Sequence, residues 1–213
     1  MDHIIAVLPY LWEGVKLTFI ITIVGVAIGF VIGAFTGMGR LAKNKFIYGL
    51  CTVYVEIIRG TPILVQILFI YFGLADLLGI NLDKITASII AIALNAGAYI
   101  AEIVRGGIQS IDKGQTEAGR SIGLTAAQTM RYIIWPQAFK RMIPPLGNQF
   151  IISLKDTSLF SAIAVGELLY QGKYYASSTF VYFEPYAMVA LFYLAITIPS
   201  MLILRRVERR LDV

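Results

Sequence analysis

A polar stripe interrupts one strongly apolar part of the sequence. Gln149, Ser153 and Asp156 follow one another at i, i+4 and i+7, so they would share one face of a helix. Lys155 stands beside Asp156, after thirteen residues without a charge. An ionisable group inside a bilayer costs about 2.5–3.5 kcal/mol, so both charges need a partner or a task. Either they neutralise one another, or Asp156 binds a cationic group of a ligand.

Thr157 and Ser158 follow this pair directly, and their hydroxyl groups are of the type that caps helix N-termini. The stretch KDTSLF is therefore predicted to break one helix and to begin another. Free backbone N–H groups at such a start attract carboxylates, and broken membrane helices are a usual place for a substrate. We expect an anionic group of a ligand to bind at this break.

A second polar stripe repeats the same spacing. Asn95, Tyr99 and Glu102 also follow at i, i+4 and i+7 within an uninterrupted apolar stretch. Asn95 lies eleven residues beyond Lys84, about 16 Å along a helix, which places it near the middle of a bilayer. Glu102 could instead pair with Arg105 at i+3.

A third set of polar groups surrounds a proline. Glu56 and Arg59 are spaced as an i, i+3 ion pair, and Arg59 continues along one face to Pro62 and Gln66. Pro62 lacks an N–H group and so frees a backbone carbonyl of the preceding turn. It could act as a gate hinge or simply as a packing residue.

These three predicted helices offer polar groups of both charge signs at overlapping depth. A zwitterionic ligand could place its carboxylate against Arg59 or the helix start at Thr157. Its ammonium group could contact Asp156 or Glu102. The alternative is a structural polar network that holds the helices together.

The composition identifies the environment of these helices. Apolar residues make up 58% of the 213 residues and charged residues 15%, with a mean hydropathy of +0.75. Such a balance predicts an all-α polytopic membrane protein with one transmembrane domain over 1–213. Five spans are expected, at about 15–38, 47–78, 84–106, 138–156 with a broken continuation at 158–172, and 185–207.

The basic residues predict the orientation. Thirteen of the eighteen flank the ends of the predicted spans that would face the cytoplasm, and only Lys16, Lys84 and Lys173 lie on the opposite side. The N-terminus is therefore predicted outside and the C-terminus in the cytoplasm. The net charge of +5 is distributed over loops that flank apolar spans, which argues against nucleic-acid binding.

Several site classes are disfavoured by what the sequence lacks. Cys51 is the only cysteine and His3 the only histidine, so no Cys/His metal cluster or mid-chain histidine triad is expected. The start MDHIIAVLPYLWEG has no basic n-region and is not expected to be a cleaved signal peptide. No GxxxxGK[ST] motif occurs, so we expect no ATP site and no enzymatic activity in this chain.

Glycines recur every fourth residue in the first span, and they would form a smooth strip along one helix face. They are Gly25, Gly29, Gly33 and Gly37. This strip predicts close approach of another helix, from either the same chain or another subunit.

The segment 112–136, between the third and fourth spans, is predicted to be a structured cytoplasmic docking surface. It should contain a short helix, a break at Gly123, and a second helix capped by Thr125, with Pro136 near the next membrane entry.

The spacing in this segment resembles the EAA loop of ABC-importer permeases. The match consists of Glu117, Ala118, Gly123, Ile133 and Pro136. The sequence departs from the family at Gly119, where a second alanine is usual, and at Trp135, where leucine is usual. The resemblance implies a coupling helix that includes Glu117, Ala118 and Gly119 and seats in a cytoplasmic ATPase.

Longer motifs extend the resemblance over most of the chain. VEIIRGTPILVQILFIYFGL, NAGAYIAEIVRGGIQSIDKGQ, PPLGNQFIISLKDTSLFSAIAVGEL and RRVERRLD look like the polar amino-acid uptake branch of type I importers. The resemblance implies an ATP-driven permease of the bacterial cytoplasmic membrane, in which Pro62 and Lys155 would belong to a gate. Its substrate is expected to be a basic amino acid such as arginine, histidine or lysine, or glutamine.

The resemblance also implies partners. A homodimer or heterodimer of permeases would bind two cytoplasmic ATPase subunits, which carry the ATP and Mg²⁺, and an extracytoplasmic solute-binding protein; this chain itself would bind no cofactor. The main alternative is a stand-alone secondary carrier or channel with ion sites at Asp156 and Glu102. A membrane scaffold without transport is a further alternative, and it would make the polar stripes dispensable.

Overall fold

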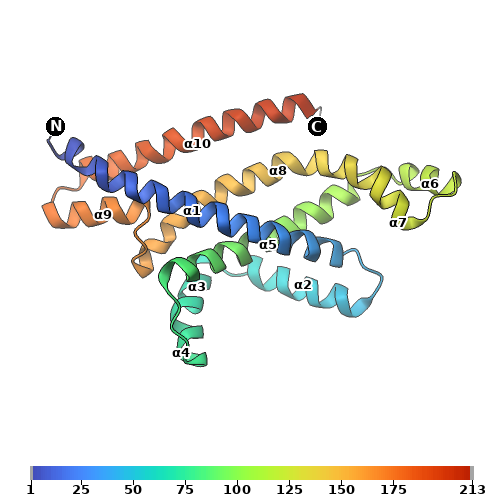
Figure 1. Cartoon of the computed structure of the whole chain (residues 1–213), viewed down its shortest axis with the longest axis horizontal. Coiled ribbons are helices and arrows are strands. Elements are labelled where there is room, and N and C mark those ends of the chain that lie inside the picture. Colours follow the sequence, from blue (N-terminus) through green and yellow to red (C-terminus); the bar gives the residue numbers. More distant parts are fainter. Residues whose placement is uncertain (1, 212–213) are drawn as a thin grey trace.

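The computed structural model describes residues 2–211, and the regular elements in that part of the chain are all helical (Figure 1). The α-helices are α1 (Asp2–Gly39), α2 (Lys45–Arg59), α3 (Ile63–Leu68), α4 (Leu74–Leu78), α5 (Lys84–Gln109), α6 (Lys113–Ser121), α7 (Ala126–Thr129), α8 (Trp135–Asp156), α9 (Leu168–Thr179) and α10 (Phe183–Leu211). Two π-helical turns, η1 (Phe69–Gly73) and η2 (Met130–Ile134), and one 3-10 helix, η3 (Thr157–Ile163), connect some of them.

The glycine strip of α1 packs directly on the backbone of α5. A Cβ atom at Gly33 would lie 2.7 Å from the carbonyl oxygen of Gly97, and one at Gly37 would lie 2.6 Å from that of Ala101. Neither distance leaves room for a side chain. The close approach that the strip predicts is therefore made within this chain.

Helix α1 begins well before the predicted boundary at residue 15. Its first part packs Val7 and Leu11 against Leu168 and Val189, which belong to α9 and α10. The predicted bound refers to the membrane span, which stays a prediction; it follows from the charges of Glu13 and Lys16 at the start of the apolar run. These two side chains form an exposed ion pair at 2.7 Å on the helix surface.

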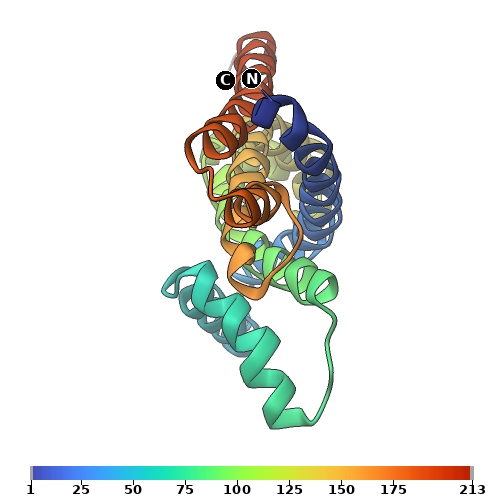
Figure 2. The ribbon, with the colours of Figure 1, turned by 90° about the vertical axis from the view of Figure 1, so that its left-hand side faces the viewer.

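The predicted span 47–78 is not one straight helix, which corrects its expected geometry. Helix α2 ends at Arg59 and the following helical segment turns by 102°. Pro62 explains the break, because its ring and missing N–H disfavour continuation of α2. Figure 2 shows the segment from α3 to α4 projecting away from the other helices. We call residues 60–62 the elbow.

Three described helices, α1, α5 and α10, are long and apolar enough to cross a membrane alone. The bent pair of α2 with the segment 63–78 could be a fourth span. Helix α8 has 22 residues but is more polar along its length. The number of five spans, and the orientation, stay predictions.

The predicted helix start at Thr157 and Ser158 is wrong. The Thr157 hydroxyl donates to the Leu154 oxygen and the Ser158 hydroxyl to the Lys155 oxygen, both at 2.7 Å. Both groups therefore bond back into the preceding turn, and the chain continues as η3. The next α-helix begins only at Leu168, so the continuation predicted over 158–172 also starts too early.

The segment 112–136 has the predicted helix, break and second helix. Gly123 has a φ of +89°, and Thr125 and Gln128 form a reciprocal capping box at the start of α7. Gly119 is buried where α6 meets η2, and a Cβ there would lie 2.8 Å from Thr129 Cγ2. This contact is a physical reason for glycine at that position. Helices α6 and α7 lie at the opposite end of the molecule from α9 (Figure 1).

Candidate functional site

A hollow of about 460 Å³ lies between the elbow, α5 and α8, and it brings together residues from all three of the predicted polar sets. Its lining comprises Arg59, Gly60, Thr61, Pro62, Ile63, Asn95, Tyr99, Gln149, Ile152 and Asp156. Six of these were expected from the sequence as ligand-binding or gate residues: Arg59, Pro62, Asn95, Tyr99, Gln149 and Asp156.

Gln66 stabilises the elbow, although it was not predicted as a site residue. In a continuous helix the Ile58 oxygen would accept from the N–H of residue 62, but Pro62 has none. Gln66 replaces that donor, with its Nε2 atom 2.7 Å from the Ile58 oxygen and 3.0 Å from the Thr61 oxygen. A glutamine four residues after a helix-breaking proline was the available signal.

The same glutamine reaches across to α5. Asn95 Nδ2 donates to Gln66 Oε1 at 3.0 Å, and both side chains are buried. Asn95 also lines the hollow. The backbone carbonyl freed at the elbow is therefore connected to the hollow through two amide side chains.

On α8 the predicted polar stripe divides into a bonded pair and a carboxylate. Gln149 Nε2 donates to Ser153 Oγ at 3.3 Å, and both residues are buried. Asp156 lines the hollow at the end of α8, while Lys155 is exposed. Within residues 2–211 no ion pair joins these two side chains at 4.0 Å or less. Direct mutual neutralisation is thus not the arrangement observed.

Arg59 lies at the edge of the hollow between two contacts. Its guanidinium carbon is 5.3 Å from the centre of the Tyr99 ring, a distance at which a cation and an aromatic face attract one another. Its Nη1 atom is 3.6 Å from Glu102 Oε2. The sequence had predicted a pair with Glu56, but Glu56 lies 3.6 Å from Arg40 instead. Arg40 lies in the turn directly after α1, so spacing along α2 could not identify this partner.

Glu102 is the centre of an arginine cluster beside the hollow, and it does not belong to the lining. Arg105 Nη2 lies 2.7 Å from its Oε2 atom, as the i+3 alternative predicted, and Arg40 forms a second ion pair with Oε1. Together with Arg59, three guanidinium groups share one carboxylate. This leaves Asp156 as the carboxylate among the residues that line the hollow.

Two other predicted ligand residues lie away from the hollow. Thr157 is fully buried with its hydroxyl bonded to backbone, and Ser158 is half-buried; neither is part of the lining. The next α-helix, α9, is capped instead by Glu167, whose side-chain oxygens accept from Leu169 N at 2.8 Å and Tyr170 N at 2.7 Å. This buried carboxylate was missed because glutamate is a less usual N-cap than serine or threonine.

The other end of the molecule presents the predicted docking segment. Glu117, Ala118 and Ile122 are exposed on or directly after α6, with Ile122 76% exposed. Gly119 lies on the buried side, and Pro136 is in the first turn of α8. The role of this surface in docking a partner stays a prediction.

A family model described as "Binding-protein-dependent transport system inner membrane component" matches residues 29–213. The glutamine transport system permease protein of Escherichia coli (strain K12) is 47% identical over 97% of this chain and 94% of its own length. The arginine transport system permease protein of Bacillus subtilis (strain 168) is 32% identical over 96% of this chain and 93% of its own length.

Solved structures share the fold. The crystal structure of an amino acid ABC transporter with histidines superposes with a TM-score of 0.91 at 42% identity, covering 95% of this chain and 94% of that one. An inward-facing MetNI methionine ABC transporter gives a TM-score of 0.75 at 23% identity, with 94% and 97% covered, a likeness of fold alone.

Proposed function

The chain belongs to the family of binding-protein-dependent transport system inner membrane components, and from that premise we propose that a polar amino acid crosses the membrane through the hollow between the elbow, α5 and α8. The protein is an ABC-transporter permease of the amino-acid uptake type. The single observation that supports the site is the convergence of Arg59, Asn95, Gln149 and Asp156 on one hollow.

The charges of the lining favour a zwitterion with a neutral side chain. Arg59 is its one guanidinium group and Asp156 its one carboxylate. They can pair with the α-carboxylate and the α-ammonium group of an amino acid. A basic side chain would need a second carboxylate, and Glu102 is already shared by three arginines. This argument revises the preference for basic amino acids drawn from the sequence.

The amide groups of the lining support glutamine as the first candidate. Asn95 donates to Gln66 and Gln149 donates to Ser153, so each keeps its side-chain oxygen as an acceptor. Such acceptors suit the NH₂ group of a glutamine side chain, and the Escherichia coli relative is named for glutamine transport. Arginine is the second candidate, because its guanidinium could use the same acceptors and the Bacillus relative is named for arginine transport.

The energy would come from partner subunits. The exposed surface of α6 around Glu117, Ala118 and Ile122 would seat in an ATPase, and two permease chains, identical or similar, would bind two such subunits. A solute-binding protein would deliver the amino acid from outside. Closure of the ATPases, which bind the ATP and Mg²⁺, would move α6 and change access to the hollow around Pro62 and Lys155.

Transport by the complete importer in proteoliposomes tests this proposal. The Asp156→Asn variant should reduce amino-acid-stimulated ATP hydrolysis by about tenfold or more, because loss of one charge-assisted contact is worth about 1.5–3 kcal/mol. Asp76→Asn, an exposed aspartate on α4, is the matched control and should behave as the unmodified chain.

Uptake should be highest for glutamine when labelled glutamine, arginine and histidine are compared. Preference for arginine would favour the second candidate. Unchanged substrate dependence in both Asp156→Asn and Asn95→Ala would remove the hollow from the transport route.

A further inference from the structure

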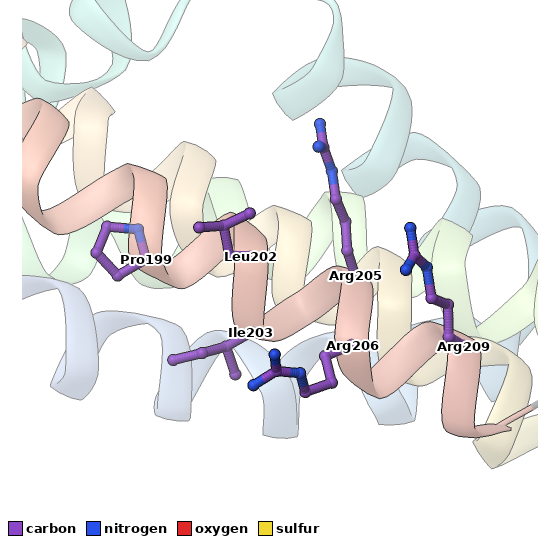
Figure 3. A pocket seen from close by; sticks show the side chains of 6 residues that line it. All are labelled: Pro199, Leu202, Ile203, Arg205, Arg206 and Arg209. Carbon is purple, nitrogen blue, oxygen red and sulfur yellow. The ribbon is translucent and has the colours of Figure 1, made fainter.

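The end of α10 combines an apolar surface with a cluster of exposed arginines. A hollow of about 430 Å³ is lined by this helix alone, through Pro199, Leu202, Ile203, Arg205, Arg206 and Arg209 (Figure 3). The apolar run of the helix ends at Leu204, so the arginines begin where the helix would leave the hydrocarbon of a bilayer. Along α10 the apolar part of the hollow is therefore followed by its cationic part, just as the acyl region of a lipid leaflet is followed by its head groups.

The guanidinium groups of the three arginines lie on two sides of α10. Figure 3 shows Arg205 and Arg209 extending to the same side of α10, while Arg206 extends to the other side, beside Ile203. All three are exposed, as is the neighbouring acid Glu208. In the described residues 2–211 no carboxylate lies within 4.0 Å of their guanidinium groups.

A second hollow continues from the first, between α10 and α8. It measures about 510 Å³ and shares Ile203 with the arginine-lined hollow. The residues that line it are Ile143, Leu146, Gly147, Phe150, Ile151, Ser200, Ile203, Leu204 and Val207. Ser200 is the one polar side chain among them, and its hydroxyl already donates to the Ile196 oxygen at 2.7 Å. This groove therefore offers an occupant apolar contacts only.

We propose that an anionic glycerophospholipid binds here, with its phosphate against Arg206 on the side of Ile203 and one acyl chain in the α8–α10 groove, while Arg205 and Arg209 add positive charge from the other side of the helix. Guanidinium groups bind phosphate through paired N–H donors, and basic clusters beside membrane helices attract anionic head groups. The acyl chain covers an apolar groove that a free phosphate would leave empty. A second copy of this chain could cover the groove, but its contact there would not supply an anion to the three arginines.

Phospholipid retention by the purified importer tests the proposal. Arg205→Gln, Arg206→Gln and Arg209→Gln are combined in one variant, and Lys43→Gln, Lys45→Gln and Arg131→Gln form a control that removes three exposed charges elsewhere. Affinity for phosphatidylglycerol, measured by native mass spectrometry against phosphatidylcholine, should fall by about 100-fold in the first variant, at roughly fivefold for each basic residue. The control should keep the affinity of the unmodified chain.

A groove variant separates the acyl chain from the head group. Ser200→Phe fills the groove and leaves the arginines unchanged, so it should also release the bound lipid while α10 stays helical by circular dichroism. Equal retention of both lipids, equal retention in the arginine variant and its control, or displacement by glycerol phosphate alone would overturn the proposal. So would disulfide cross-linking between two copies carrying Ile203→Cys in a Cys51→Ser background. None of these outcomes bears on the substrate hollow.

Discussion

Two interruptions of helices border the same hollow, and they satisfy their backbone groups in different ways. At the elbow the freed Ile58 oxygen bonds to Gln66, which in turn bonds to Asn95 on another helix. After α8 the hydroxyl groups of Thr157 and Ser158 bond within their own turn. The first interruption therefore depends on a residue that lines the hollow, whereas the second does not.

The difference assigns different tasks to the two sides of the hollow. A ligand that contacts Asn95 can alter the support of the elbow, because Asn95 holds Gln66 in place. The segment from Thr157 to Glu167 is closed by its own hydrogen bonds and by the Tyr193 hydroxyl, which donates to Glu167 at 3.2 Å. We expect the elbow to respond to a ligand and the segment 157–167 to stay fixed. We call this segment, which follows Asp156 but does not itself line the hollow, the fixed wall.

The largest effect should come from removing the cap of the fixed wall. Glu167→Ala leaves two part-buried N–H groups and the Tyr193 hydroxyl without their acceptor, which should destabilise the fold by about 3 kcal/mol. The melting temperature in detergent should fall by about 6–12 °C. The melting temperature of Glu167→Gln, which keeps one acceptor, should lie between those of Glu167→Ala and the unmodified chain. A melting temperature within about 1 °C of the unmodified chain in Glu167→Ala would show that the wall does not depend on this carboxylate.

A double-mutant cycle at the elbow should give the next largest effect. Gln66→Leu should destabilise the fold by about 2 kcal/mol, since the Ile58 and Thr61 oxygens lose a donor. Combined with Asn95→Leu, it should show an interaction energy of about 1 kcal/mol. The pair Gln66→Leu and Glu167→Gln is the control, and its effects should add. Additivity in the first pair would contradict the proposed link between elbow and hollow.

The hydroxyl of Ser158 should matter little. Ser158 does not line the hollow, and its bond to the Lys155 oxygen is one of several that support that turn. Ser158→Ala should change stability by about 0.5 kcal/mol or less and leave uptake close to that of the unmodified importer. A loss of uptake above about fivefold would return Ser158 to the site predicted from the sequence.

The smallest effect concerns an exposed cap, in contrast to the buried Glu167. Asp83 caps α5, and hydrogen bonds from the Thr86 side chain and backbone hold the pKa of its carboxyl below the usual 3.8. A lowered pKa stabilises the folded chain at neutral pH, and this contribution is lost as the pH falls through about 4 and below. Asp83→Asn, also a good cap, should leave stability at pH 7 unchanged and reduce only this acid dependence. Melting temperatures of the unmodified chain and Asp83→Asn at pH 7 and near pH 3 would measure this acid dependence. An equal loss of stability in both chains at low pH would contradict the role assigned to Asp83.

Much of the fold follows from local sequence. Long uncharged runs predicted α1 and α10. The residue types of Gly123, which favours a break, and Thr125, which favours an N-cap, predicted the break before α7. The site was predicted in part, because i, i+4, i+7 spacing places residues on one face but does not show which helix that face meets. Thus Asn95 and Asp156 were found, but the pairing of Arg40 with Glu102, 62 residues apart, was not.

The break after α8 shows why a local rule can be wrong. Thr157 and Ser158 have the right side chains for an N-cap, but the same hydroxyl groups can bond back to the preceding turn. Which bond forms depends on where the following residues pack. Phe160 and Ile163 are buried in the core beside Ile67 and Ile92, and this tertiary packing accompanies a 3-10 helix at that point.

The glycine strip has a mechanical consequence. Two helices in backbone contact have no layer of flexible side chains between them that could deform, so α1 and α5 cannot slide past one another without losing the contacts at Gly29, Gly33 and Gly37. The pair should therefore move as one rigid body. Opening and closing of the hollow would then be hinge motion at the elbow, with α1 and α5 as the frame against which it swings.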